Sequence, residues 1–151
     1  MTLTAAGSER KFDLHALPAP ALLIFHGDNN TDTVAEANVV IRADFPGADQ
    51  LLIASVIDLH HIPRMFRPMA VRAMKKAYER SGELIPAELD AEAYVILLPD
   101  WDGSLAKFVG FEGVGEVPGI AVVDRAGRLH GAFQGDGAIE QALATVREVA
   151  D

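Results

Sequence analysis

Three short and nearly continuous runs of apolar residues place the strongest limit on how this chain can fold. They cover residues 21–26, 51–57 and 94–98. Runs of this length are typical of strands that are covered on both faces, as in a parallel sheet, rather than of helices. Helical patterns lie between the runs. The order strand, helix, strand therefore predicts right-handed crossovers and an α/β fold.

The predicted helices are marked by their ends as well as by their periodicity. Thr33 and Glu36 have the spacing of a capping box, and Pro46 with Gly47 ends the apolar stripe that follows. A second helix is predicted over residues 69–80, entered through prolines and closed near a glycine. Both helices are long enough to cover a face of the sheet.

The rest of the chain predicts a short helix, an antiparallel hairpin and a terminal helix. These elements are expected at residues 104–111, 120–123, 129–133 and 139–150. Residues 1–11 are small and polar, and we expect them to form a flexible N-terminal arm. The predicted order is β-α-β-α-β-α-β-β-α, in a single domain of residues 12–151.

Residues 94–136 have the pattern of a strand, an Asp-rich turn, a Leu-Ala-Lys helix, a Val-Pro step, a second strand and an Asp-x-x-Gly hairpin. This pattern resembles the redoxin branch of the thioredoxin-like superfamily, which includes peroxiredoxins and their thiol-disulfide oxidoreductase relatives. The resemblance implies a three-layer thioredoxin-like fold, with a central mixed sheet and helices on both faces. It also implies that the bond between Val117 and Pro118 is cis and faces the active site. The alternative is a proline that begins a strand.

The chain contains no cysteine, so it has no thiolate nucleophile and no disulfide. Aligning residues 22–25 with the first core strand of the family places Asn30, Thr31, Asp32 and Thr33 where an oxidoreductase carries Cys-x-x-Cys. The resemblance thus implies a vestigial site that has lost its thiol chemistry. The alternative is that Asp32 and Thr33 only cap the helix.

Histidines and aspartates follow the first two apolar runs. His26 and Asp28 follow the first run, and Asp58 and His60 follow the second. Carboxyl ends of parallel strands meet at one edge of a sheet, where ligands usually bind, so these side chains form a possible polar cluster. The chain has no HxxxH or HxH spacing, and we favour solvated loop histidines over a metal site. We predict no metal and no cofactor.

The most unusual local feature is a basic segment in an acidic chain. The net charge is -9, yet residues 64–80 carry +5 and three of the four methionines. Its candidate partner-binding cations are Arg64, Arg67, Arg72, Lys75 and Lys76. Methionines suit adaptable contact surfaces, so the segment predicts a protein partner or self-association. The alternative is an ordinary helix with core methionines and solvated charges.

These observations favour a binding or interaction module without thiol redox activity, with a homodimer as one form of that role. The alternatives are a redoxin-family antioxidant or oxidoreductase-related protein, and a non-thiol enzyme that uses the polar cluster. The acidic net charge argues against nucleic acid as a partner. No apolar stretch has the length of a membrane span and no leader pattern begins the chain, so we expect no membrane partner and a cytoplasmic location.

Overall fold

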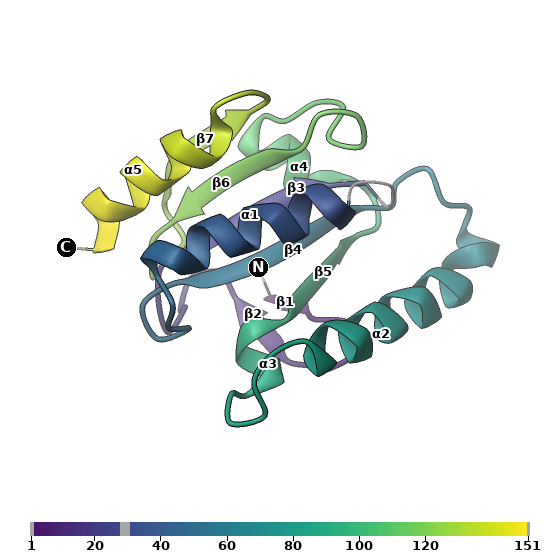
Figure 1. Cartoon of the computed structure of the whole chain (residues 1–151). Coiled ribbons are helices and arrows are strands. Elements are labelled where there is room, and N and C mark those ends of the chain that lie inside the picture. The colour runs from purple at the N-terminus through teal and green to yellow at the C-terminus, as the bar shows by residue number, and fades with distance from the viewer. Residues whose placement is uncertain (1, 28–30, 151) are drawn as a thin grey trace.

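Five strands form one mixed sheet in the part of the chain that the computed structural model describes, residues 2–27 and 31–150 (Figure 1). Their order across the sheet is β5-β4-β3-β6-β7. The bounds are Ala21–His26 for β3, Leu52–Asp58 for β4, Ile96–Asp100 for β5, Gly119–Val123 for β6 and Leu129–Gln134 for β7. β3, β4 and β5 are parallel, whereas β6 and β7 are antiparallel to their neighbours. The predicted mixed sheet is confirmed.

The three apolar runs contain the larger part of the three parallel strands, although β5 begins two residues later than the run over residues 94–98. β3 lies at the centre of the sheet, and all of its residues are buried. It pairs with β4 from Ala21 opposite Leu52 to His26 opposite Ile57. Because a central strand is covered on both faces, neither set of its alternating side chains meets water. This explains why its sequence is continuously apolar.

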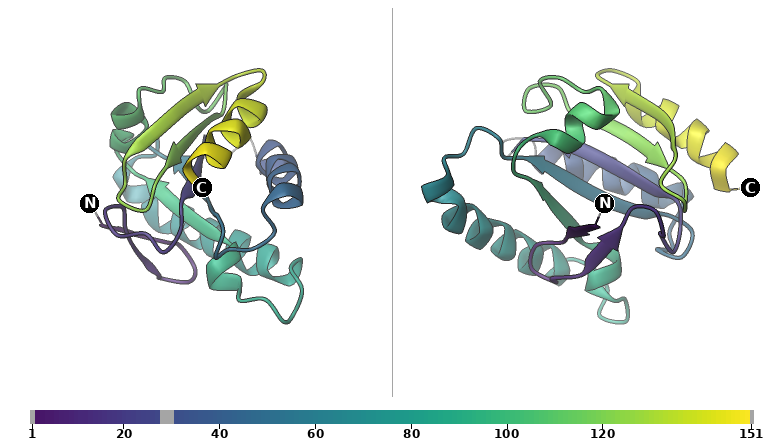
Figure 2. Two further views of the ribbon diagram at one scale, coloured as in Figure 1. Left: turned by 90° about the vertical axis from the view of Figure 1, so that its left-hand side faces the viewer. Right: turned by 180° about the vertical axis from the view of Figure 1, so that it is seen from behind.

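Helices cover both faces of the sheet, as Figure 2 shows. Their bounds are Thr31–Asp44 for α1, Ser104–Val109 for α4 and Ala138–Ala150 for α5. Leu22 and Ile24 of β3 pack in an apolar layer with α1 and α5. Leu23 and Phe25, which alternate with them, pack in a second layer with α4 and the N-terminal residues. The molecule therefore has the three layers that the resemblance implies.

The N-terminal segment forms a hairpin, not the flexible arm that the sequence predicts. Its strands are Thr2–Thr4 for β1 and Lys11–Asp13 for β2. Ala5 and Phe12 are buried in the apolar layer beneath α4. The Ala6 N–H donates to the Leu97 carbonyl at the outer edge of β5 (2.8 Å). Two buried side chains and a backbone hydrogen bond thus order a segment that looks polar in sequence.

α2 (Arg67–Glu83) lies along the outer edge of the sheet and follows a 3₁₀ turn, η1 (Arg64–Phe66). It is longer than the predicted helix over residues 69–80 at both ends. Pro68 sits in its first turn, where a proline costs no hydrogen bond, and Gly82 lies inside the helix instead of closing it. A short helix, α3 (Ala91–Tyr94), begins with Asp90 as its cap and was not predicted. None of the helices in the described part of the chain has the length and apolar character that a membrane span needs.

Arg42 holds the connection between α1 and β4 in place. Its Nη1 donates to the carbonyl oxygens of Phe45 (3.0 Å), Gly47 (3.2 Å) and Leu51 (2.9 Å). The guanidinium also lies over the ring of Tyr94, 5.0 Å from its centroid. One side chain therefore fixes the start of a central strand.

We expect Arg42→Met to lower the free energy of unfolding by about 1–3 kcal/mol, because three carbonyl groups lose a charged donor while the apolar stem is kept. Urea denaturation would measure the change. Arg147→Met is the matched control, because the ion pair of Arg147 with Asp44 is exposed and such pairs contribute about 0–1 kcal/mol. An equal loss of unfolding free energy in the two variants would show that Arg42 does not hold the connection between α1 and β4 in place.

Candidate functional site

The positions that the resemblance aligns with the redoxin site follow the carboxyl end of β3. α1 begins there, and Thr31, Asp32 and Thr33 are its first residues. Asp28 and Asn30 lie outside the residues that the structure describes. Because the helix begins two residues before Thr33, the predicted helix start at Thr33 is wrong.

Val117 and Pro118 lie beside this position, because β6 is the antiparallel neighbour of β3. The bond before Pro118 is trans, so the cis form that the resemblance implies is wrong. Two hydrogen bonds hold Val117 in this arrangement. Its N–H donates to the Gly113 carbonyl (2.9 Å), and its carbonyl accepts from Gln134 Nε2 (2.8 Å). Trans is also the lower-energy form of such a bond, by about 0.5–1 kcal/mol.

The predicted cluster of histidines and aspartates is divided between the two faces of the sheet. His26 pairs with Ile57, and it alternates with Phe25, so it points to the face that α1 covers. Asp58 is one position beyond Ile57 and points to the opposite face. His26 is buried, and its Nδ1 lies 2.6 Å from the Gly27 carbonyl oxygen. The sheet thus separates His26 from Asp58.

Asp58 and His60 do come together, at the carboxyl end of β4. His60 Nδ1 lies 2.6 Å from Asp58 Oδ1, which also accepts a hydrogen bond from the His60 N–H (3.1 Å). The His60 side chain is 60% exposed. Within the described ranges, no group of three or more histidine and acidic side chains has the arrangement of a metal site. The pair is a hydrogen-bonded turn at the surface.

Asp100 is the buried carboxylate at this edge, and no pattern in the sequence marks it as buried. It lies opposite Asp58 in the pairing of β4 with β5. Its oxygens accept hydrogen bonds from the N–H groups of Leu105 (3.3 Å) and Ala106 (3.1 Å). Burial raises the pKa of Asp100, while these two hydrogen bonds lower it. Its position fixes the start of α4, which is a structural role.

The segment that contains η1 and α2 presents apolar side chains to solvent. Met65 is 77% exposed, Met69 64%, Phe66 48% and Val71 47%. Of the residues of α2, all of which are described, only Met74 is buried. The alternative of core methionines therefore holds for Met74 alone.

The same segment carries six cations. They are Arg64, Arg67, Arg72, Lys75, Lys76 and Arg80. None of the six forms an ion pair with an acidic side chain in the described ranges. The guanidinium of Arg67 lies over the ring of Trp101, 5.1 Å from its centroid. Residues 64–80 are termed the α2 surface below.

A shallow apolar groove of about 360 Å³ opens at the start of the α2 surface. It is lined by His61, Ile62, Pro63, Phe66, Met69 and Ala70. The groove therefore joins the exposed methionine and phenylalanine side chains to the turn that contains the Asp58–His60 pair. A bulky apolar side chain of a partner protein would fit into this groove.

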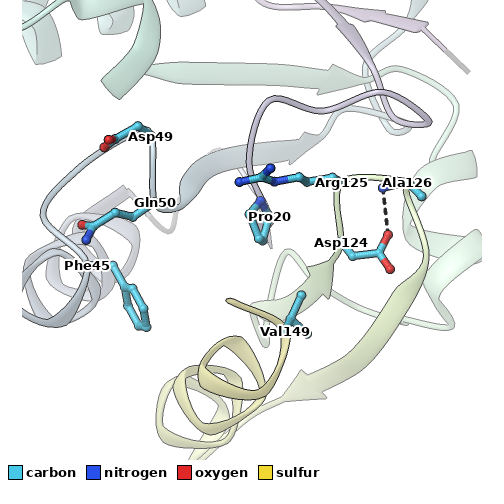
Figure 3. Close-up of a pocket in the computed structure, with 8 residues that line it drawn as sticks. All are labelled: Pro20, Phe45, Asp49, Gln50, Asp124, Arg125, Ala126 and Val149. Carbon is cyan, nitrogen blue, oxygen red and sulfur yellow. Dashed lines mark hydrogen bonds between the residues drawn. The ribbon is translucent and has the colours of Figure 1, made fainter. Parts of the chain in front are cut away.

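A larger pocket of about 640 Å³ lies at the other end of the sheet (Figure 3). It is lined by Pro20, Phe45, Asp49, Gln50, Asp124, Arg125, Ala126 and Val149. The carboxylate of Asp124 accepts hydrogen bonds from the N–H groups of Ala126 and Arg128 (both 2.9 Å) and lies 2.8 Å from His130 Nε2. It therefore belongs to the turn of the hairpin. None of the predicted site residues lines this pocket.

Solved structures of other proteins share this fold. The match to the exposed lipoprotein thioredoxin Etrx1 of Streptococcus pneumoniae has a TM-score of 0.64 at 17% identity and covers 98% of each chain. The match to StoA of Bacillus subtilis has a TM-score of 0.60 at 12% identity and covers 95% of this chain and 93% of StoA. DsbF of MTB matches with a TM-score of 0.57 at 21% identity, over 99% of this chain and 94% of DsbF. No family model and no curated protein matches the sequence.

The chain therefore has the fold of the thioredoxin-like disulfide oxidoreductases, as the resemblance implies. It differs from that class in its chemistry, because it contains no cysteine. Its carboxyl edge has no sulfur nucleophile, and the residues described there do not bring histidine and carboxylate groups together beyond the exposed Asp58–His60 pair. The α2 surface is the feature of the described chain that the fold alone does not explain.

The hydrogen bond to His130, followed by that from the Arg128 N–H, lowers the pKa of Asp124 below its ordinary value of 3.8. A carboxylate with a lowered pKa stabilises the folded state above its unfolded pKa, and this contribution is lost as the pH falls through the folded value. We therefore expect Asp124→Asn to lower the urea midpoint at neutral pH and to change it little in strong acid. Asp49→Asn, in the same pocket, is the control. An equal shift at both pH values would contradict this assignment.

Proposed function

We propose that this protein binds an acidic and partly apolar surface of a protein partner through the α2 surface, without thiol redox chemistry. One observation supports the proposal most directly. Exposed methionine and phenylalanine side chains share a segment with six cations that have no acidic partner in the described ranges. Solvation accounts for such cations, but it does not account for the apolar side chains between them.

The apolar side chains favour a contact surface because they gather in one place. Single exposed hydrophobic residues are ordinary, whereas a contiguous patch marks an interaction site. Met65, Phe66 and Met69 are all within five residues of one another, and two of them line the apolar groove. Methionine side chains are flexible and polarisable, so they can fit partners of different shapes.

The charge of the segment favours an acidic partner. Residues 64–80 carry +5, whereas the remainder of the chain carries -14. Cations at the rim of an apolar contact steer an oppositely charged partner and exclude basic ones. The proposal therefore combines apolar contacts for affinity with electrostatic contacts for selection.

The non-thiol enzyme alternative needs acid–base groups that converge in a cleft. His26 lies on the α1 face of the sheet and Asp58 on the other, so the two do not converge. The Asp58–His60 pair is exposed and lies beside a shallow groove. These positions give the enzyme alternative less support than the α2 surface gives to binding.

We expect the purified protein to show no disulfide reductase and no thiol peroxidase turnover, because it has neither a nucleophilic nor a resolving thiol. Insulin reduction and peroxide consumption with thiol donors would measure both activities, with a cysteine-containing thioredoxin as the positive control. Turnover that stays with the protein through successive purification steps would contradict the expectation.

A labelled peptide of alternating glutamate and leucine should bind the intact protein, as measured by fluorescence anisotropy. Trp101 gives a second signal, because Arg67 stacks on it. The double variant Arg72→Glu, Lys76→Glu should weaken binding by about tenfold or more, because it places like charges opposite the peptide. Added salt should also weaken binding.

The matched control is Arg125→Glu, Arg128→Glu, which makes the same change in net charge in the exposed hairpin turn far from α2. It should leave peptide binding nearly unchanged. If the two double variants lose affinity equally, net charge and not the α2 surface governs binding. If the intact protein does not bind the peptide, the proposed function is wrong.

A further inference from the structure

The segment that follows α2 has the opposite charge to the α2 surface and a similar apolar character. Residues 83–92 contain four acidic residues and no basic one. The acidic side chains, all exposed, are Glu83, Glu88, Asp90 and Glu92. Leu84 is 84% exposed and Leu89 38%. No ion pair to lysine or arginine involves these carboxylates in the described ranges. The segment is termed the acidic end below.

Exposed apolar side chains therefore occur at both ends of α2, together with basic residues at its start and acidic residues at its end. Six of the eleven large apolar side chains that are exposed in the described chain lie in residues 65–89. α2 itself has 17 residues, which corresponds to a length of about 25 Å. The two ends are therefore too far apart to neutralise each other within one molecule, where they lie at opposite ends of the same helix.

The outward face of α2 connects the two ends. Met69, Arg72, Lys76 and Glu83 are spaced so that they lie on the side of the helix opposite to the buried Met74. No acidic residue occurs in the first turn of α2. A helix N-terminus attracts negative charge, and here Arg64 and Arg67 add to its positive potential. The start of α2 therefore favours acidic side chains from another molecule.

We propose that a second copy of this chain covers α2, in a two-fold symmetric dimer in which the two α2 helices run antiparallel. This places residues 64–72 of one copy against the acidic end of the other, and the symmetry makes the same contact twice. The inference rests on the proposed function, because it names the acidic partner of the α2 surface. The complementary surface occurs on the same chain, at the distance that an antiparallel pair of helices requires.

The size of the surface agrees with this pairing. Residues 64–92 are similar in number to one side of a standard protein interface, about 20–30 residues. The exposed leucines of the acidic end would meet the apolar groove and Met69, while the carboxylates would meet Arg64, Arg67 and Arg72. Antiparallel helix dipoles add a further favourable contribution.

Sedimentation velocity of the purified protein at low salt should give a dimer that dissociates on dilution and in high salt. Two charge-reversed variants test the pairing. Variant one, Arg64→Glu with Arg72→Glu, makes both ends acidic, and variant two, Glu83→Arg with Glu88→Arg and Glu92→Arg, makes both ends basic. Each variant alone should be monomeric, because like charges face each other across the two-fold axis. Circular dichroism confirms that each is folded.

A mixture of the two variants gives the decisive result. In an antiparallel pair, both acidic ends of variant one face both basic ends of variant two, so the mixture should form a heterodimer. Recovery of a heterodimer in the mixture supports the arrangement, with Arg125→Glu, Arg128→Glu as the control that should leave the dimer of the intact protein unchanged. Variants that remain dimeric alone, or a mixture that stays monomeric, would overturn it.

The inference and the proposed function can fail separately. The intact protein could be monomeric at millimolar concentration and still bind the acidic peptide through Arg72 and Lys76. In that case the proposal of a dimer is wrong, and the partner is another acidic protein. If the protein neither dimerises nor binds the peptide, both are wrong. The same samples serve for both measurements.

Discussion

The in-register parallel pairing of β3 with β4 is the constraint on which the rest of the structure depends. With His26 opposite Ile57, it fixes the faces to which the side chains at the carboxyl ends of β3 and β4 point. Asp58 comes one position later, and a shift of one residue in a strand reverses the face. The same pairing that builds the continuous apolar core therefore keeps His26 away from the Asp58–His60 pair. The edge where such folds usually bind ligands has, in its described residues, the Asp58–His60 pair as its only close histidine–carboxylate contact.

The strands of the sheet could be predicted from the sequence because burial on both faces leaves a strong signal in each of them. The N-terminal hairpin could not be predicted in this way. It is ordered by the burial of Ala5 and Phe12 and by the backbone hydrogen bond to Leu97, and none of these contacts produces a periodic pattern in the sequence. The extent of α2 was underestimated because Pro68 looks like a boundary in sequence but is well tolerated in a first turn. Local sequence patterns therefore predicted the strands and helices of the three layers, whereas the N-terminal hairpin depends on contacts between residues far apart in the sequence.

The candidate site was less predictable than the fold. The resemblance predicted that Val117 and Pro118 lie near the start of α1, and they do lie beside the carboxyl end of β3. The conformation of the backbone there depends on Gln134, a residue on a different strand. The sequence marked the cations of residues 64–80 but not Leu84 or Leu89, because a leucine in an acidic segment gives no sign of its exposure. Their exposure depends on where α2 lies, which is a property of the whole fold.

α2 is exposed because the edge of the sheet beside it is already occupied. The N-terminal segment takes the outer edge of β5, and Gly7 allows the ring of Tyr78 to approach so closely that a Cβ there would lie 2.5 Å from Tyr78 Cγ. α2 therefore contacts the rest of the molecule along a narrow line that includes Met74, whereas α1 and α5 each bury an apolar stripe on the sheet. A helix held in this way needs few apolar residues for its own packing. The exposed Met69 and Val71 of α2, and Met65 and Phe66 of η1 before it, therefore require another cause, and contact with a second molecule supplies one.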